Sequence, residues 1–317
     1  GGRPIFVEVT ESLVIDLDDL AVKAAQNPRA RVLLLSHMRG HIVDMEKLMR
    51  VASAASLCVI EDCAHTMGAR WGGVLSGRHG LVGCFSTQTY KHMNSGEGGL
   101  LITDDCDVMA RAILLSGSYM LFEKHRAGPS AEAFHRARYD TPNISGRMDN
   151  LRAAILRPQL RNLDTRCEAW NARYQAVEKG LRGTTGLTLI ERPALESYVM
   201  SSFQFLLLDW PFEAVGSVVQ RCAERGVALQ WFGRPGAPDG FTSRYEHWEF
   251  APSDPMPQSD RVLAGVLDMR LPLTFTLADC ALIARIVKEE VGAVWQEQHV
   301  QEEVAAAAIS TGAASKR

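Results

Sequence analysis

Apolar and amphipathic segments alternate along the first half of the chain. Residues 31–36 (RVLLLS) have the pattern of a buried strand, and residues 44–56 place their apolar side chains on one helical face. Further short apolar runs predict strands at 57–60, 83–86 and 99–103, and Asp104–Asp105 can start a helix that runs to about residue 115. This alternation predicts an α/β fold with a mainly parallel sheet covered by helices.

The second half combines a long irregular segment with a second α/β pattern. Residues 117–146 are rich in Gly, Pro, Ser and His and predict a loop with one short helix. A helix that links two domains is expected from residue 148 to about 179, with a kink at Pro158. Strand, helix and strand patterns then follow at 202–208, 212–225 and 226–231. We expect a large domain at 1–165, a smaller α/β domain at 166–295, and a disordered tail or fraying helix at 296–317.

Composition and charge argue against nucleic acid and membranes as binding partners of this chain. The chain of 317 residues has 34 basic and 37 acidic side chains, a formal net charge of -3, and so lacks the basic footprint of nucleic-acid-binding proteins. Its apolar runs are far shorter than the roughly 20 residues that cross a bilayer. The seven cysteines are scattered without a C-x-x-C pair, which is typical of reduced thiols in a cytoplasmic protein. We therefore expect a cytoplasmic protein with neither nucleic acid nor membrane as a partner.

The N-terminal sequence GGRPIFVEV predicts a strand at residues 4–9, almost at the first residue. It has neither an initiator methionine nor the basic and apolar regions of a secretory signal. We expect that part of the large domain precedes this sequence.

Two oppositely charged side chains follow neighbouring predicted strands. Asp62 comes at the end of the strand LCVI, and Lys91 follows the strand GCFS within the turn FSTQTYKHMNSGEGG. A lysine amine can form a Schiff base with pyridoxal phosphate (PLP), and a carboxylate can keep the pyridine nitrogen protonated. The Ser86 hydroxyl is suited to bind the cofactor phosphate. The same residues are also compatible with an ordinary surface ion pair.

Other motifs give weaker signals. The glycines around RHGLVG have the wrong spacing for a dinucleotide or triphosphate loop. His37 and His41 lie in a loop rather than on a helix, and Cys63 with His65 makes only one short pair, so we predict no metal site.

The string VIEDCAHTMGARWGGVLSGRHGLVGCFSTQTYKHMNSGEGGLLITDD resembles the lysine-bearing core of the DegT/StrS family, the sugar aminotransferases of PLP fold type I. The segments SGRMDNLRAAILRPQLRNLD, LQWFGR and LPLTFTLADCALIARIV resemble later parts of that family, so the resemblance covers residues 1 to about 292. It implies a large domain with a mainly parallel sheet and a smaller C-terminal α/β domain.

The resemblance also implies roles for individual residues. Lys91 would hold PLP covalently, Asp62 would pair with the ring nitrogen, Ser86 would bind the phosphate, and His65 would lie beside the ring and its hydroxyl. Ser145 stands where the family commonly has an asparagine that reaches the cofactor of the neighbouring subunit, with Asn143 close by in the sequence. The family's N-terminal phosphate turn and its ring-stacking aromatic residue have no counterpart here, so cofactor binding by this chain is expected to be weakened.

The implied function is transfer of an amino group from glutamate or glutamine to a keto sugar, carried on a nucleotide, by a homodimer. Lys91 argues against a related dehydratase, because those relatives have histidine at this position. The alternative from another class is a catalytically silent or regulatory protein, or a fragment, that keeps the same fold. The sequence does not specify the sugar or the position that is aminated.

Overall fold

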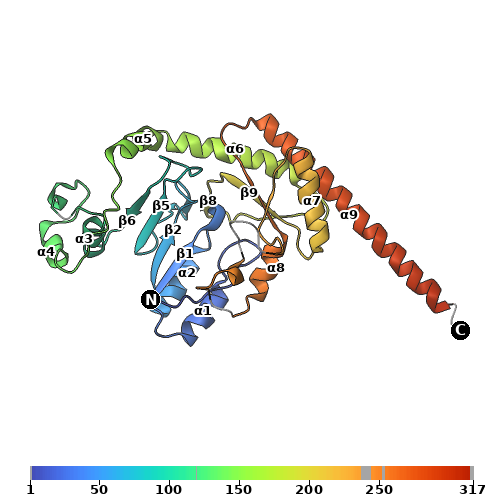
Figure 1. The fold of residues 1–317 in the computed structure, drawn as a ribbon, viewed down its shortest axis with the longest axis horizontal. Helices are drawn as coiled ribbons and strands as arrows, with labels where there is room; N and C mark the ends of the chain where they lie inside the picture. Colours follow the sequence, from blue (N-terminus) through green and yellow to red (C-terminus); the bar gives the residue numbers. More distant parts are fainter. Residues whose placement is uncertain (1, 119, 237–243, 252–253, 315–317) are drawn as a thin grey trace. The chain divides into compact units, whose positions relative to one another are not determined.

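Four strands in the order β1-β2-β5-β6 form the sheet of one of the two units into which the chain divides (Figure 1). The computed structural model describes residues 2–118, 120–236, 244–251 and 254–314. We call Val14–Glu168 with Pro193–Ser201 the parallel-sheet unit. The antiparallel-sheet unit comprises Gly1–Leu13, Ala169–Arg192 and Ser202–Arg317.

The sheet of the parallel-sheet unit confirms the predicted strands. Its elements are β1 (Val32–Ser36), β2 (Cys58–Asp62), β5 (Val82–Ser86) and β6 (Gly99–Ile102). The first three strands run parallel, and β6 pairs antiparallel with β5. Ser36 pairs with Asp62, and Asp62 pairs with Cys84, so the carboxyl ends of β1, β2 and β5 meet at one edge. Ligands of open α/β sheets bind at such an edge.

Aspartates begin the main helices of this unit. The helices are α1 (Leu17–Gln26), α2 (Met45–Ala54) and α3 (Cys106–Leu115). Asp16, Asp44 and Asp105 are their N-cap residues, and each carboxylate accepts hydrogen bonds from backbone N–H groups of the first turn. The buried side chains of α2 are those of Met45, Leu48 and Ala52, as its apolar periodicity predicts.

The irregular segment 117–146 contains η2 (Phe122–Lys124) and one short helix, α4 (Ala131–Ala137). α4 packs on α3 through a small separate core in which the rings of Phe122 and Phe134 stack with centroids 4.6 Å apart. The prediction of a long segment with one short helix is confirmed, and the 3₁₀ turn is an addition to it.

The long helix expected after residue 148 is two helices, α5 (Asn150–Arg161) and α6 (Leu163–Leu181). The expected kink at Pro158 is wrong in position, because α5 continues past Pro158 and ends at Arg161, with Asn162 as its C-cap. Proline lacks a backbone N–H and crowds the preceding turn, which weakens the helix shortly before its end. The chain passes from one unit to the other within α6, between Glu168 and Ala169.

Several short elements had no recognisable sequence pattern. β3 (Arg70–Trp71), β4 (Val74–Leu75) and β8 (Glu196–Ser197) form a second, three-stranded sheet in the parallel-sheet unit. A 3₁₀ turn, η1 (Met38–Gly40), follows β1. Strands of two residues are too short to show a hydrophobic period.

The antiparallel-sheet unit has four strands in the order β10-β11-β9-β7. They are β7 (Thr188–Leu189), β9 (Ser202–Leu206), β10 (Gln230–Trp231) and β11 (Val266–Arg270). The other elements of this unit are α7 (Phe212–Glu224), η3 (Tyr245–His247), α8 (Pro257–Gly265) and α9 (Leu277–Ala314). Phe203 of β9 packs on Tyr174 of α6, with ring centroids 4.9 Å apart.

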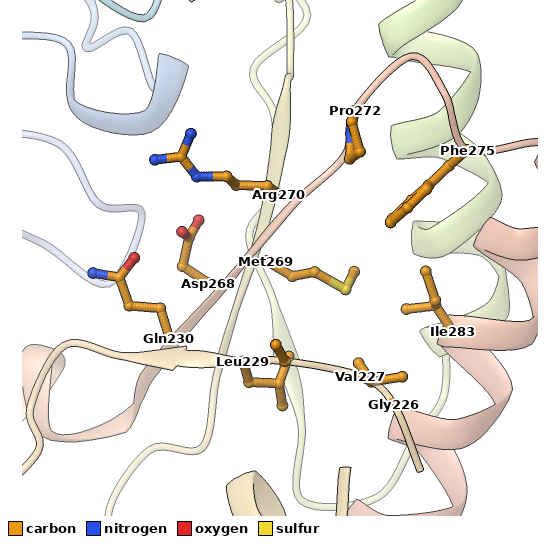
Figure 2. A pocket seen from close by; sticks show the side chains of 11 residues that line it. Gly226, Val227, Leu229, Gln230, Asp268, Met269, Arg270, Pro272, Phe275 and Ile283 are labelled. Atoms are coloured by element: carbon orange, nitrogen blue, oxygen red, sulfur yellow. The ribbon is translucent and has the colours of Figure 1, made fainter. Parts of the chain in front are cut away.

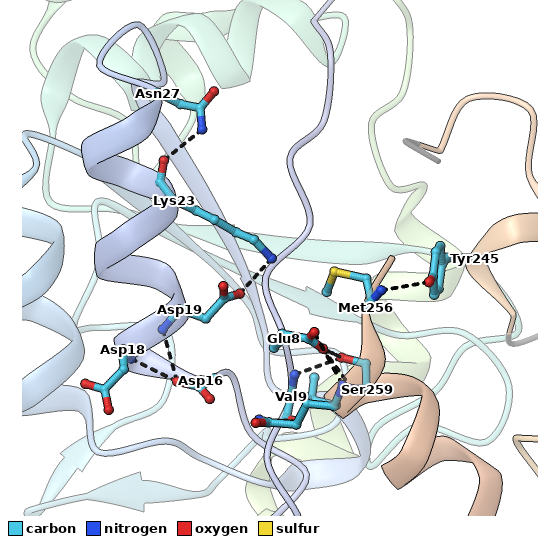
Figure 3. A network of polar contacts seen from close by, with 11 residues as sticks. Glu8, Val9, Asp16, Asp18, Asp19, Lys23, Asn27, Tyr245, Met256 and Ser259 are labelled. Carbon is cyan, nitrogen blue, oxygen red and sulfur yellow. Dashed lines mark hydrogen bonds and ion pairs between the residues drawn. The ribbon is translucent and has the colours of Figure 1, made fainter. Parts of the chain in front are cut away.

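Two predicted strands differ in the structure. Only Gln230 and Trp231 of the expected strand 226–231 pair with β11. The expected strand at 4–9 is wrong, because that segment is irregular apart from a single bridge residue, Val9. The Val9 N–H donates to Ser259 Oγ (Figure 3). The Val9 carbonyl accepts from Gln258 Nε2. Side chains of α8 therefore satisfy backbone groups that a strand would pair.

The segment 296–314 is the end of α9, and residues 315–317 lie outside the described residues. Whether this segment frays or is disordered in solution stays a prediction. Within the part of the chain that the structure describes, no helix combines the length and the apolarity needed to cross a membrane.

Candidate active site

Asp62 is the last residue of β2 and lies at the carboxyl edge of the sheet. Its two carboxylate oxygens accept hydrogen bonds from Ser36 Oγ at 3.2 Å and from the backbone N–H of Ala64 at 3.0 Å. A carboxylate offers about four lone-pair positions, so these bonds orient Asp62 and leave capacity for a ligand. Asp62 is half-buried, which lets it face a ligand at this edge.

Lys91 lies in the loop that joins β5 to β6 and is held by its neighbours on both sides. The next residues, His92 and Met93, are 2% and 1% exposed and anchor the loop in the interior. Gln159 of α5 binds both the N–H and the carbonyl of Asn94 through its amide group. Tyr90 has a φ of +75°, an uncommon conformation for a residue with a side chain. The loop conformation around Lys91 is therefore fixed by burial and by α5.

Lys91 and His65 meet across this edge. The distance between Lys91 Nζ and His65 Nε2 is 3.0 Å, and both side chains are half-buried. His65 is three residues beyond Asp62, so the loop after β2 brings the carboxylate and the imidazole to the same edge as the lysine. The structure thus brings together residues from the ends of two neighbouring parallel strands.

Ser86 ends β5, two residues beyond Cys84, the strand partner of Asp62. Its hydroxyl accepts a hydrogen bond from the Gln88 N–H at 3.2 Å and can still donate to a ligand. Of the three predicted cofactor contacts, Asp62 therefore lies on β2, Ser86 on β5, and Lys91 in the loop between β5 and β6. Their roles stay predictions.

Ser145 lies elsewhere in the parallel-sheet unit, beside the C-terminal end of α3. Its φ is +57°, and its N–H donates to Asn143 Oδ1 at 2.9 Å. Its neighbours are held by the end of α3, since Ile144 donates to the Leu115 carbonyl and Arg147 donates to the Ser116 carbonyl. Ser145 is exposed, and its role at a neighbouring subunit stays a prediction.

A buried polar network under this edge was not predicted. The carboxylate of Glu61, which is 0% exposed, accepts hydrogen bonds from His37 Nε2 and from the N–H groups of Gly77, His79 and Gly80. Burial alone would raise the pKa of Glu61, but the bonds from His37 and from the Gly80 and Gly77 amides outweigh it and lower the pKa. A signal was present in the sequence, because Glu61 occupies an inward position of a buried strand.

The glycines near this network are explained by close backbone approach. A Cβ on Gly83 would lie 2.5 Å from the Gly77 carbonyl oxygen, and a Cβ on Gly80 would lie 2.5 Å from the Val59 carbonyl oxygen. These glycines let the loop 77–80 pack against β2 and β5, where its amides reach Glu61. They serve this packing rather than a phosphate loop.

His37, Glu61 and Cys63 place their possible ligand atoms within 4.8 Å of one another. The two oxygens of Glu61 already accept four hydrogen bonds, and the Cys63 thiol contacts Ser76 Oγ at 3.3 Å. Burial raises the pKa of the Cys63 thiol to about 12, so it is protonated at neutral pH. We interpret this group as a structural network, and the absence of a metal site stays a prediction.

His92, the residue after Lys91, has a pKa that depends on burial and on nearby positive charges. Its pKa is lowered to about 4, first by burial and then by the positive charges of Lys91 and Arg166. His92 is therefore neutral at physiological pH and adds no charge to the site. Sequence analysis missed this residue, because its burial follows only from the folded loop.

A pocket of about 460 Å³ lies in the antiparallel-sheet unit. It opens where residues 226–229 diverge from β11, and its apolar lining includes Leu229, Met269 and Ile283 (Figure 2). Figure 2 shows the side chain of Met269 on one side of β11 and the side chains of Asp268 and Arg270 on the opposite side. The predicted site residues do not line this pocket.

Comparison of the sequence with known protein families shows which family the chain belongs to. The sequence profile of the DegT/DnrJ/EryC1/StrS aminotransferase family matches residues 1–288. The chain belongs to this family. The resemblance seen in the lysine-bearing segment is thereby confirmed.

Two curated relatives of this DegT/DnrJ/EryC1/StrS family member are longer proteins, and the chain matches only part of each. The L-glutamine:2-deoxy-scyllo-inosose aminotransferase of Streptomyces lividus is 33% identical over 186 residues, 58% of this chain and 42% of that protein. The dTDP-3-amino-3,4,6-trideoxy-alpha-D-glucose transaminase of Streptomyces venezuelae is 32% identical over 194 residues, 60% of this chain and 46% of that protein. The chain thus spans less than half the length of these relatives in the matched regions.

Solved structures confirm the fold. DesV of S. venezuelae, determined in complex with a ketimine intermediate, has a TM-score of 0.74 and 23% identity, covering 92% of this chain and 73% of that chain. PseC of Helicobacter pylori, an aminotransferase involved in the biosynthesis of pseudoaminic acid, has a TM-score of 0.76 and 16% identity, covering 92% of this chain and 74% of that chain. The family member therefore has the predicted α/β fold of fold type I PLP transferases.

The donor set at the strand ends fits PLP, the cofactor that the family implies. Lys91 would supply an amine for the cofactor carbonyl, Asp62 would supply a carboxylate for a protonated ring nitrogen, and Ser86 would supply a hydroxyl for the phosphate. Asp62 and Ser86 end adjacent strands, and Lys91 lies in the loop that follows β5. Neighbouring groups already orient Asp62 and Lys91.

Proposed function

We propose that the chain is a PLP-dependent aminotransferase that moves an amino group from glutamate or glutamine to a keto sugar carried on a nucleotide. The observation that carries this proposal is the contact of Lys91 Nζ with His65, which lies in the loop after β2 at the carboxyl edge of the parallel sheet. Family membership and the names of relatives support the reaction class.

Each residue would have a distinct task. Lys91 would hold the cofactor through Nζ and, once released by the donor amine, would take the proton from the donor's α-carbon and return it later. When bound, PLP supplies a carbonyl that accepts the amino group and an electron-poor ring that stabilises negative charge on that carbon. Asp62 would hold a proton on the ring nitrogen, Ser86 would bind the phosphate, and His65 would lie beside the ring.

We infer that the enzyme is a cytoplasmic homodimer. Ser145, with Asn143 beside it, would reach the cofactor phosphate of the neighbouring subunit, a role that the exposure of both residues permits. The thiols are free, as expected for a reducing compartment.

A keto cyclitol without a nucleotide is the second candidate substrate. The name of one relative specifies 2-deoxy-scyllo-inosose with L-glutamine as amino donor, whereas another names a dTDP-linked sugar. The test is to incubate the chain with PLP, glutamine or glutamate, and both kinds of ketone, and to detect the aminated product by mass spectrometry. Formation of either product supports an aminotransferase and selects the substrate class. No product with any ketone would contradict the proposal and favour a catalytically silent protein.

Replacement of Asp62 with asparagine is expected to lower kcat about 100-fold or more, because an amide does not hold a proton on the ring nitrogen. Asparagine keeps the size of the side chain and an oxygen that can accept from Ala64 or Ser36. Asp104→Asn is the matched control, because the Asp104 side chain is 97% exposed. Steady-state rates of the three proteins give the comparison. Equal rates for D62N and wild type would exclude this role.

A further inference from the structure

Tyr90, the residue before Lys91, has a backbone conformation that ordinarily belongs to glycine. The Lys91 N–H donates to the Gln88 carbonyl oxygen at 3.2 Å, which closes a four-residue turn with Tyr90 at its third position. Of the two central residues of this turn, Thr89 and Tyr90, only Tyr90 has a positive φ, +75°. This is the pattern of a type II turn, whose third position favours glycine or asparagine. Tyrosine at this position therefore strains the backbone.

The loop around this turn holds the strained conformation in place. The N–H groups of Thr87 and Thr89 donate to the carbonyl oxygens of Gly98 and Gly96, each at 2.9 Å. These bonds tie the segment before the turn to the segment after it. Tyr90 is thus held at its positive φ by the pairing of the loop on both sides.

Burial of the Tyr90 side chain does not offset this strain, because the residue is 72% exposed. A large aromatic side chain stabilises a fold mainly through the apolar surface that it removes from water. Asparagine or glycine would fit the turn without strain and would leave less apolar surface in water. A strained and exposed aromatic residue therefore indicates a function rather than a contribution to stability.

The place of Tyr90 next to Lys91 indicates which part of a substrate it meets. Consecutive Cα atoms are about 3.8 Å apart, so Tyr90 lies beside the residue that would deliver the amino group. The ketone belongs to a six-membered ring in both candidate substrates, the nucleotide-linked sugar and the cyclitol. Such a ring presents C–H groups on its faces and hydroxyl groups around its rim. Tyrosine presents the matching surfaces, an apolar ring face and a hydroxyl at its tip.

We propose that Tyr90 is a substrate-binding residue whose aromatic ring packs against the six-membered ring that carries the ketone; this role rests on the proposed function. The turn fixes the backbone of Tyr90 beside Lys91 and so gives the aromatic ring a defined starting point. Tyr90 contacts the ketone substrate and not the amino donor. It therefore acts in only one of the two half-reactions.

Tyr90→Asn separates this role from a structural one, because asparagine tolerates the positive φ of the turn. We expect the Tm of Y90N to equal that of wild type or to rise by about 2 °C. The KM for the keto substrate should rise about tenfold, because the aromatic contact is lost. The rate at which the chain takes the amino group from glutamate or glutamine should be unchanged, since no ketone is present in that step. Single-turnover measurements give the rates of the two half-reactions.

Two further variants complete the comparison. Tyr90→Phe keeps the ring and should raise KM less than Y90N does. Tyr139→Asn is the matched control, because Tyr139 is an 86% exposed tyrosine of the same unit, and it should change neither half-reaction. An unchanged KM in Y90N would overturn the proposal. A lower Tm, or an equal loss in both half-reactions, would show that Tyr90 supports the loop instead.

An NMR titration tests the contact without any amino transfer. The tyrosine rings carry an isotope label, and Y90F identifies the Tyr90 signal by its change. We expect dTDP-glucose and scyllo-inositol each to shift this signal, whereas dTDP, which lacks the hexose ring, should not. A shift with neither ring-bearing probe, or an equal shift with dTDP, would contradict the proposal. A specific shift with no product in the ketone assay would support the binding role of Tyr90 and contradict the proposed function.

Discussion

Replacement of Lys91 with alanine is expected to reduce amino transfer by on the order of 10³-fold or more, because it removes both the covalent link to the cofactor and the group that moves the substrate proton. Lys91→Arg should be equally inactive, since a guanidinium stays protonated and does not form that link. Lys47→Ala, on an exposed part of α2, is the control and should keep wild-type turnover. Retained activity in K91A would eliminate the proposed mechanism.

The same variants also have a readout that needs no substrate. The positive charge of Lys91 is one cause of the low pKa of His92, about 4, although burial is the larger cause. K91A should therefore raise the pKa of His92. The raised pKa should still lie below the ordinary value for histidine, because the ring remains buried. K91R keeps the charge and should leave it low. An NMR titration of the His92 ring measures both, and an unchanged value in K91A would show that Lys91 does not lie where the structure has it.

Replacement of Glu61 with glutamine is expected to lower the free energy of unfolding by about 3 kcal/mol at neutral pH. The Glu61 carboxylate accepts from His37 and from three backbone N–H groups of the loop 77–80. A glutamine side chain has one oxygen instead of two. Its NH₂ group would face some of the N–H groups that donate to Glu61, and those groups would lose their acceptor. Because Glu61 directly precedes Asp62, we also expect weaker cofactor binding in E61Q.

The pH dependence of this contribution has a defined sign. The pKa of Glu61 is lowered in the folded protein from its ordinary value of 4.5. Its contribution to stability is therefore fully present above about pH 4.5, and it is lost as the pH falls through the lower folded-state pKa. Urea unfolding at several pH values should show this loss in wild type and not in E61Q.

Glu46→Gln provides the control for Glu61, because Glu46 is an exposed glutamate in the first turn of α2. We expect its unfolding free energy to stay within about 0.5 kcal/mol of wild type. Equal stability of E61Q and E46Q would contradict a structural role for the buried network.

The strands and capped helices of the parallel-sheet unit were predictable because their signals are local. The apolar run before Ser36 and the periodic apolar positions of α2 each lie within one element. The N-cap aspartates likewise act on the next turn of chain. Errors occurred where a distant segment decides the outcome, as at Val9, whose backbone groups are taken by side chains of α8.

The candidate site was predictable in composition but not in geometry. Lys91, Asp62 and Ser86 were recognisable from their places after strands and from the family resemblance. The contact of Lys91 with His65 depends on two loops and cannot be read from spacing. The partners of Glu61 lie 16 to 24 residues away, so only the folded chain shows that they converge on one carboxylate.

The central claim is that Lys91 is the lysine that holds PLP, and one labelling experiment tests it directly. The purified chain is mixed with PLP, treated with borohydride, and digested, and the modified peptide is located by mass spectrometry. The structure and the family predict one dominant adduct, on Lys91 Nζ. Labelling scattered over exposed lysines such as Lys47, or no adduct at all, would contradict it.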